Sequence, residues 1–313
     1  MNKTEILADS TGWHGHRAVT YKVSFPQIVA KEVLRHRVFS FLAASQRAIP
    51  FEKNLLKTKE NTFIPIAWQK AHKGMQGSEY FSKEDSGVLD KIWEKAARSM
   101  FDIASELNEY KATKQLSNRL LEQFQYVDML VSGTEYDNFF KLRNHEAAEI
   151  HIADLAELMQ EGYKRNKPDY LQPGDWHIPY NSNFPENTEL FDKIKSSAGR
   201  CARLSYNTFD GKQSIAEDVR LYSDLIENEP VHASPTEFPL RCMSEKEYYA
   251  FKKTVSISEK YYDSYSQKWQ EGRHYDRLGV TEDFGQKIYI LCEYGWCRNY
   301  RGFRPLRDIL GLK

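Results

Sequence analysis

The residues best suited to chemistry lie close together in one basic stretch. Cationic and hydroxyl side chains recur between positions 35 and 47: Arg35, His36, Arg37, Ser40, Ser45 and Arg47. Guanidinium groups bind phosphates through paired hydrogen bonds, and serine hydroxyls add neutral donors. This density of donors indicates one ligand with two phosphates, or two phosphate-bearing ligands. The alternative is a solvated basic helix end with ordinary surface ion pairs, because basic tripeptides are common.

The elements before this stretch must position it. Apolar residues alternate along 17–25 and predict a strand with one buried face: Val19, Tyr21, Val23 and Phe25. Pro26 suits the first residue of a helix, and apolar spacing extends that helix through 26–37. The basic tripeptide would then lie at the helix C-terminus, where the helix dipole favours positive charge. Residues 39–50 are expected to form an irregular loop or a short strand.

Longer helices are predicted in the next hundred residues. The expected ranges are 86–108, 111–126, 134–143 and 146–163, with Thr134 as the N-cap of the third. The last range has the clearest amphipathic stripe: Ala148, Ile152, Leu155, Ala156 and Met159.

The C-terminal part reads as a mixture of both element types. A strand is predicted at 201–206, a helix at 214–228, a Pro-broken extended piece at 232–242 and a charged helix at 244–271. Aromatic-rich elements follow around Tyr289, Tyr294 and Trp296. No regular strand–helix alternation is present, so the sequence predicts an α+β fold with a mixed sheet and packed long helices.

One proline-rich stretch divides the chain. Four of the eleven prolines fall within 168–185. We therefore expect a segment 1–165 that carries the basic signature and a helical ligand-binding part. A connection at 166–192 follows, and a segment 193–313 completes the same catalytic fold.

Composition excludes several classes of protein. Lys plus Arg and Asp plus Glu both number 44 in 313 residues, so the formal net charge is zero. This argues against a globally basic nucleic-acid coat and against an acidic tail protein. No apolar run is long enough to predict a membrane span, and the N-terminus lacks an apolar signal core.

The four cysteines show no zinc-type or redox-type spacing. Free thiols in a reducing, cytoplasmic compartment are therefore expected.

The basic stretch RHRVFSFLAASQR (35–47) resembles the signature of the flavin-dependent thymidylate synthases. Its three basic residues, two serines and final arginine match the family pattern, whereas Leu42 stands where the family usually has Asn. NRLLEQF (118–124) and TEYDNFFKLRNHEAAEIHIADLA (134–156) resemble two further family segments. GRCARLSY (199–206) and HASPTEF (232–238) resemble elements that precede the signature in short members of the family.

In this chain those two elements come after the signature. This order resembles that of a longer branch of the family, in which the segments are rearranged. GDWHIPY (174–180) and NYRGF (299–303) also occur in that branch. The first His of the HASPTEF element is kept as His232. Phe238 stands where the family often has a His that contacts the flavin, at the end of that element.

The resemblance implies methylation of dUMP at C5, with methylenetetrahydrofolate as the carbon donor, FAD as the hydride carrier and NADPH as the reductant. It also implies nucleotide and folate as the ligands, no nucleic acid, no membrane, no metal and a homotetramer. No cysteine nucleophile is used in the family. A reactive thiol at Cys297, which has Arg298 and Arg301 nearby, is the alternative.

The resemblance also implies site residues. Those expected to bind dUMP are Glu32, Arg35, Ser45, Gln46, Arg47, Arg119 and Arg143. Those expected to bind FAD are Arg35, His36, Arg37, Ser40 and Asn138. Arg143 is the expected catalytic residue, because a guanidinium beside the N3–C4–O4 edge of uracil would make C5 richer in electrons.

Ordinary structural roles are the alternatives for several of these residues. Arg143 could pair with Glu146 or Glu149, and Arg119 with Glu122 or Asp128. Asn138 could be a plain helix-face amide.

Two other functions remain open from the sequence. One is a related flavoenzyme that modifies another pyrimidine nucleotide or adds a different one-carbon group. The other is a nucleic-acid-binding module that uses the basic helix in a groove, against which the zero net charge counts. A metal site at His145, Glu149 and His151 is not expected. The zinc-protease pattern needs a second His where Glu149 stands, and helical spacing puts His151 on a different helix face from His145 and Glu149.

Overall fold

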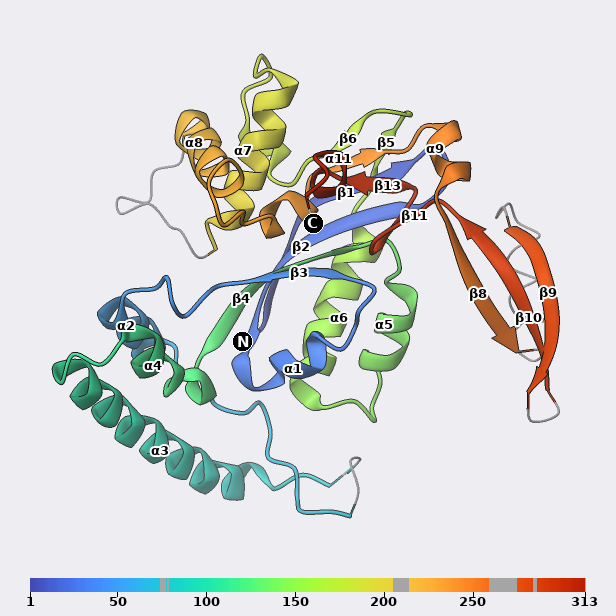
Figure 1. Cartoon of the computed structure of the whole chain (residues 1–313). Coiled ribbons are helices and arrows are strands. Elements are labelled where there is room, and N and C mark those ends of the chain that lie inside the picture. The colour runs from blue at the N-terminus through green and yellow to red at the C-terminus, as the bar shows by residue number, and fades with distance from the viewer. Residues whose placement is uncertain (74–76, 78, 205–213, 259–274, 284–285, 313) are drawn as a thin grey trace.

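A five-stranded mixed sheet forms the centre of the molecule (Figure 1). The computed structural model describes residues 1–73, 77, 79–204, 214–258, 275–283 and 286–312. The strand order is β3-β4-β2-β1-β5, and only the β1–β5 pair is parallel. The strands are β1 (Lys3–Gly12), β2 (Arg17–Pro26), β3 (Ser40–Ala43), β4 (Tyr126–Gly133) and β5 (Asp169–Leu171). The expected α+β class with a mixed sheet is confirmed.

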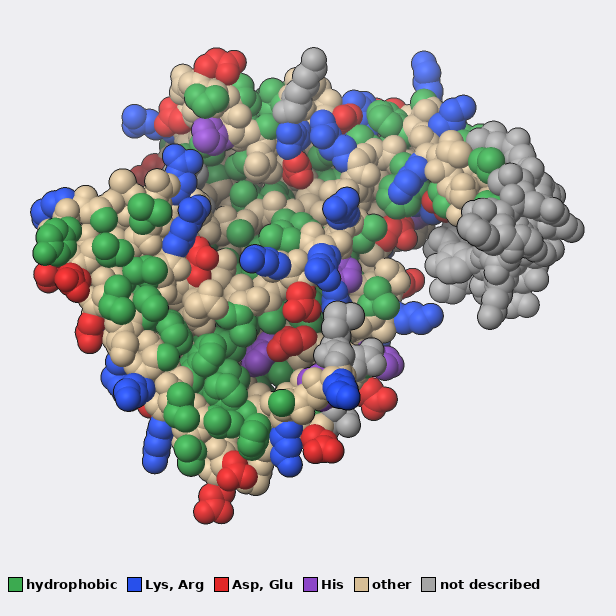
Figure 2. Space-filling view, turned by 60° about the horizontal axis from the view of Figure 1, so that its bottom comes forward, with side chains coloured by type: hydrophobic (Ala, Val, Ile, Leu, Met, Phe, Trp, Pro, Cys, Tyr) green, Lys and Arg blue, Asp and Glu red, His purple; other side chains and the backbone are tan. Residues whose placement is uncertain are grey.

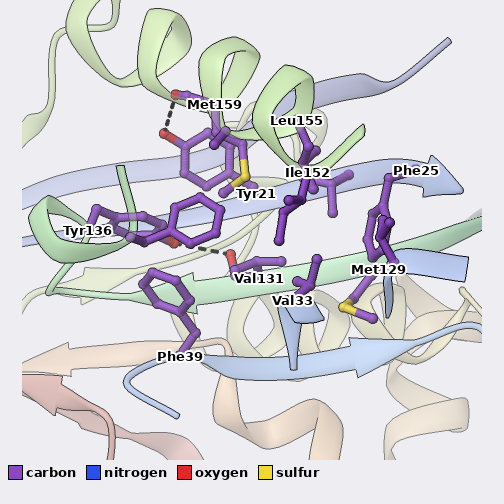
Figure 3. Packing of buried hydrophobic residues seen from close by; sticks show 14 of the residues in the cluster. Tyr21, Phe25, Val33, Phe39, Met129, Val131, Tyr136, Ile152, Leu155 and Met159 are labelled. Atoms are coloured by element: carbon purple, nitrogen blue, oxygen red, sulfur yellow. Dashed lines mark hydrogen bonds between the residues drawn. The ribbon is translucent and has the colours of Figure 1, made fainter. Parts of the chain in front are cut away.

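One face of the sheet packs against α5 (Asp137–Arg143) and α6 (Ile150–Arg165). Figure 3 shows the labelled aromatic and aliphatic side chains of β2 and β4 meeting those of α6. The hydroxyl of Tyr21 donates to the Met159 carbonyl at 3.0 Å. The alternation predicted for β2 and the stripe predicted for α6 are confirmed, except that Ala148 precedes the helix.

The other face of the sheet packs against α7 (Leu190–Ala202) and the segment of the 3₁₀ helix η4 (Ser234–Glu237), and α8 (Ile215–Ile226) packs on α7. Successive residues of a strand point to opposite faces. Leu130 of β4 therefore packs away from Met129 and Val131, against Cys201 and Phe238.

Three helices between β3 and β4 form a layer with its own apolar core. They are α2 (Phe51–Glu60), α3 (Lys83–Glu109) and α4 (Lys114–Arg119), followed by η2 (Glu122–Phe124). Phe101 and Leu121 are among the buried residues of this core. The predicted helix at 86–108 is confirmed.

The C-terminal part forms small antiparallel sheets. Strands β6 (Trp176–His177), β7 (Leu240–Cys242) and β13 (Phe303–Pro305) pair in the order β13-β7-β6. Strands β11 (Trp296–Cys297) and β12 (Tyr300–Arg301) form a short hairpin. Strands β8 (Lys252–Ser258), β9 (Tyr275–Asp283) and β10 (Gln286–Tyr294) make a projecting three-stranded sheet (Figure 1).

Short helices join these elements. They are η1 (Gln27–Val29), α1 (Ala30–Val33), η3 (Asn181–Asn183), α9 (Glu245–Ala250) and α11 (Leu306–Ile309).

Several predicted elements are wrong. Residues 201 and 202 end helix α7 rather than open a strand, because a short apolar run does not distinguish the two. Residues 252–258 form β8 rather than helix, since β-branched residues there outweigh the charges. Residues 205–206 and 259–271 lie outside the described residues.

Two helix boundaries also differ from prediction. The helix after Pro26 ends at Val33, before the basic residues. Helix α5 begins at Asp137, and the Thr134 hydroxyl accepts the backbone N–H of Arg301 instead of capping it. Residues 111–126 are helical only in part, and strand β4 follows them.

Candidate functional site

The basic tripeptide lies in a turn, named here the RHR turn (residues 34–39), between α1 and β3. Backbone bonds from His36 to Val33 and from Phe39 to His36 close the turn at 3.1 Å each. Val33 and Phe39 are buried in the main core and anchor both ends. Arg35 and Arg37 are exposed, and within the described residues neither guanidinium forms an ion pair or a side-chain hydrogen bond.

His36 contacts Arg143 of helix α5. The Nε of Arg143 donates to the Nε2 of His36 at 2.9 Å. Burial and the neighbouring guanidinium lower the pKa of His36 to about 4, so the ring is neutral at pH 7 and accepts this bond. The ring also meets Phe139 edge-on, with centroids 4.9 Å apart. This apolar support holds the imidazole against α5.

Glu32 completes the group. Its Oε2 lies 3.7 Å from Nη1 of Arg143, whose side chain is 21% exposed. Residues expected at the nucleotide and flavin sites therefore meet here: Glu32, His36 and Arg143. Arg143 pairs with Glu32, whereas the sequence offered Glu146 or Glu149 as the alternatives.

A second part of the signature lines a pocket of about 490 Å³. Ser45 and Arg47 lie on one wall, and His232 and Ser234 lie on another. Leu42 and Leu225 are among its apolar lining residues. Sites for small molecules commonly have this size and this mixture of apolar walls with few polar groups. The pocket joins segments almost two hundred positions apart in the sequence.

Helix α4 holds the loop that follows β3 and carries Ser45 and Arg47. The Asn118 amide donates to the carbonyls of Gln46 and Ile49 at 3.0 Å each, and Asn54 donates to Gln46 Oε1 at 3.2 Å. The Gln46 side-chain oxygen is thus already used within the protein. Arg119, next along α4, is exposed and lowers the pKa of nearby Glu122, although burial raises it overall.

The remaining predicted residues lie apart from these groups. Ser40 is buried, and its hydroxyl accepts from the amide of Asn299 at 3.3 Å. Asn138 is exposed on α5, and its side chain forms no hydrogen bond with the RHR turn or the pocket within the part of the chain that the structure describes.

The RHR turn and the loop that carries Ser45 and Arg47 lie within a match to a known protein family. Residues 11–169, half of the chain, match the sequence model of the family described as Thymidylate synthase complementing protein. The chain belongs to this family. The match ends before residues 199–206 and 232–238, so the rearranged order of those elements stays a prediction.

One curated relative in this family is a flavin-dependent thymidylate synthase from Aquifex aeolicus (strain VF5). It is 30% identical over 174 residues, which are 51% of this chain and 53% of that protein. The chain thus spans about half the length of this relative.

Two solved structures match part of the chain. Both are of a UMP/dUMP methylase, PolB from Streptomyces cacaoi, bound with 5-Br UMP or with 5-Br dUMP. The TM-scores are 0.46 and 0.44 at 16% and 14% identity. Both matches cover 53% of this chain, and they cover 89% and 91% of those chains.

The two departures from the family pattern lie in one apolar cluster. Phe238 is fully buried and packs in the same group as Leu42, Leu130 and Cys201. Leu42 also lines the 490 Å³ pocket. Where the family pattern has two polar residues, this member has two apolar residues that share a core.

Reactive-cysteine chemistry has no geometric support. All four cysteines are free and buried. Burial raises the pKa of Cys297 to about 12, so it is a thiol at neutral pH.

His151, one of the three residues considered above as a metal site, has a structural role. Its Nε2 accepts the backbone N–H of Ile66 at 3.0 Å, and its Nδ1 bonds Glu149.

One contributor was missed by the sequence reasoning. Asn299 contacts the end of the RHR turn, although it is 259 positions away from Ser40. The NYRGF motif was visible in the sequence, but nothing local to it indicates this contact.

Among the described residues, no helix is both long and apolar enough to cross a membrane.

Proposed function

We propose that the protein methylates dUMP at C5, with methylenetetrahydrofolate as the carbon donor, FAD as the hydride carrier and NADPH as the reductant. Family membership supports the reaction class. The contact between Arg143 and His36 carries the proposal, because it joins the signature to the helix that would hold the uracil ring. Both segments, 1–165 and 193–313, contribute residues to the proposed site.

The RHR turn has the donors that a flavin dinucleotide needs. Arg35 and Arg37 are exposed, flank His36 and have no carboxylate partner among the described residues, which suits a diphosphate. His36, Ser40 and Asn138 are the further proposed flavin contacts. FAD would supply hydride transfer, and the protein would supply binding and orientation.

The 490 Å³ pocket is the proposed place for the nucleotide phosphate. Arg47 and Ser45, which line the pocket, would bind the dianion there. Arg119 is not among the lining residues and is proposed as a third donor from helix α4. Glu32, Arg35 and Gln46 remain proposed contacts to dUMP.

Arg143 would act on the ring electrostatically. Its Nε is fixed by neutral His36, so its terminal nitrogens have a defined direction. Placed beside the O4 edge of uracil, this guanidinium would stabilise the negative charge that makes C5 nucleophilic. Since His36 accepts only while it is neutral, its low pKa keeps Arg143 oriented at neutral pH.

Product analysis tests this proposal. The purified protein, incubated without oxygen with dUMP, methylenetetrahydrofolate and NADPH, should produce dTMP in a flavin-dependent reaction. The apolar pair Leu42 and Phe238 favours one alternative, a flavoenzyme acting on another pyrimidine nucleotide. Parallel incubations with UMP and dCMP distinguish the two.

We also propose a homotetramer in the cytoplasm. Large apolar side chains are exposed along α3: Val88, Ile92, Ile103, Leu107 and Tyr110. Figure 2 shows hydrophobic side chains gathered over the part of the surface where this helix comes forward. Such a patch is typical of a protein interface. Light scattering tests the assembly: a monomer in solution would contradict it.

Four free cysteines support the cytoplasmic assignment, because free thiols are typical of a reducing compartment.

A further inference from the structure

Three consecutive residues of the C-terminal hairpin each bind a different segment of the candidate site. The Asn299 amide donates to the Phe39 carbonyl at 3.0 Å and to Ser40 Oγ at 3.3 Å. The Tyr300 hydroxyl donates to the Glu237 carbonyl at 2.7 Å, at the end of the 232–238 element. The backbone N–H of Arg301 donates to Thr134 Oγ1 at 3.0 Å, just before helix α5.

The hairpin itself is held firmly. Arg301 is almost completely buried, and its Nη1 lies 3.2 Å from Glu293 Oε1. Gly302 has φ +81°, and a Cβ at this position would come within 2.1 Å of the His14 ring. Only glycine fits both the backbone conformation and this close approach. The turn before it includes Arg298 at φ +53°. Residues 299–301 are therefore presented from a fixed support.

Asn299 uses this support to fix the RHR turn. An amide NH₂ group offers two donors, and the two contacts of Asn299 Nδ2 go to the last residue of the turn and to the first residue of β3. Phe39 is buried, so its carbonyl needs a partner inside the protein. Without this amide, the end of the turn that bears Arg35, His36 and Arg37 would lose two hydrogen bonds to the hairpin.

We propose that Asn299 is a positioning residue that holds the RHR turn in the geometry that binds the flavin dinucleotide. This inference rests on the proposed function. Asn299 touches neither ligand in this account and acts through Phe39 and Ser40. Its effect should therefore fall on FAD affinity and on the flavin environment more than on the stability of the fold.

Asn299→Asp is the most direct variant, because it keeps the size of the side chain and replaces both donors with acceptors. Asn299→Ala removes the donors without adding charge and serves if the first variant does not fold. Asn228→Asp is the matched control, since Asn228 is exposed and donates only to the nearby Asp224 carbonyl.

Two readouts test the proposal. FAD titration, followed by visible absorption, should show at least a tenfold rise in Kd and a changed flavin spectrum for Asn299→Asp or Asn299→Ala. The melting temperature should stay close to that of the control. Wild-type Kd and spectrum in a folded Asn299 variant would overturn the inference.

Hydrogen exchange of the ligand-free protein separates this inference from the proposed function. Amides of residues 36–43 should exchange faster in Asn299→Ala than in the wild type, whereas those of α6 should not change. Unchanged exchange at 36–43 would overturn the inference whether or not FAD binds. A wild-type protein that does not bind FAD would overturn the proposed function instead.

Discussion

Arg143 Nε donates a 2.9 Å hydrogen bond to the Nε2 of His36, across 107 positions of sequence. The bond requires a neutral imidazole, and the low pKa of His36 supplies one at physiological pH. The middle residue of the basic tripeptide therefore orients an arginine from another segment. The flanking Arg35 and Arg37 stay exposed and available for an anionic ligand.

Arg37→Ala should weaken FAD binding while leaving the fold intact. The side chain is exposed, so its removal costs little stability, but it would remove the proposed charge-assisted contact to the diphosphate. The measurement is the flavin content of the purified protein together with FAD titration. Arg98→Ala on α3, also exposed, is the control. A variant that copurifies with full flavin would remove Arg37 from the site.

Arg47→Ala and Arg119→Ala should each weaken dUMP binding by about 1.5–3 kcal/mol, the usual contribution of a hydrogen bond to a charged group. Binding of deoxyuridine, which lacks the phosphate, should change much less. Calorimetric titration with both ligands checks this, with exposed Arg220→Ala as the control. Equal losses for nucleotide and nucleoside would show that neither arginine binds the phosphate.

Phe238→Ala should destabilise the protein by about 3–5 kcal/mol, because it leaves a cavity in the cluster shared with Leu42. Leu42→Ala should cost less, and the double variant should cost less than the sum, since the two side chains share that cluster. Urea unfolding measures all three. Phe191→Ala, on the exposed side of α7, should change the stability by less than about 0.5 kcal/mol. Strict additivity would contradict the shared packing.

Stability should fall as the pH decreases from about 6.5 towards 4. His177 is buried between Thr20 and Ser10, at 2.9 and 3.0 Å, and burial lowers its pKa to about 4. Between these pH values the unfolded chain binds a proton that the folded protein does not, so protonation favours unfolding. The contribution of His177 to this loss should be on the order of 3 kcal/mol and absent above pH 6.5. His14 and His36, whose pKa values are also lowered to about 4, add contributions of their own.

Chemical unfolding at several pH values measures this dependence. His177→Gln should reduce the slope of the profile between pH 4 and 6.5, even if it is less stable at neutral pH. The same slope in wild type and variant would assign the dependence to other groups.

Local patterns in the sequence predicted local structure well. The alternation of β2, the stripe of α6 and the helix that follows Ser214 needed only neighbouring residues. Strand β4 was missed because apolar residues on both of its faces give no alternation. The misassigned end of α7 has the same origin, a short apolar run without a diagnostic period.

The residues of the candidate site also fall into two groups: those that the sequence indicates and those that only the fold brings together. The signature residues were identified by their resemblance to a family pattern, whereas their partners depend on tertiary folding. Nothing near Ser45 indicates His232, and nothing near Phe39 indicates Asn299. The contact of Leu42 with the Phe238 cluster was equally hidden, although each departure was visible alone.

The most direct test of the account is the single-turnover reaction of Arg143→Lys. Lysine keeps the positive charge but loses the planar guanidinium that His36 orients and that would bond the uracil edge. Because this interaction would strengthen in the transition state, its loss should lower the rate more than the affinity. Reduced enzyme is mixed with dUMP and methylenetetrahydrofolate, and flavin oxidation and dTMP are followed together. We expect most of the rate to vanish while some dUMP binding remains. Oxidation and dTMP formation at the wild-type rate would contradict the role of Arg143 and the mechanism built on it.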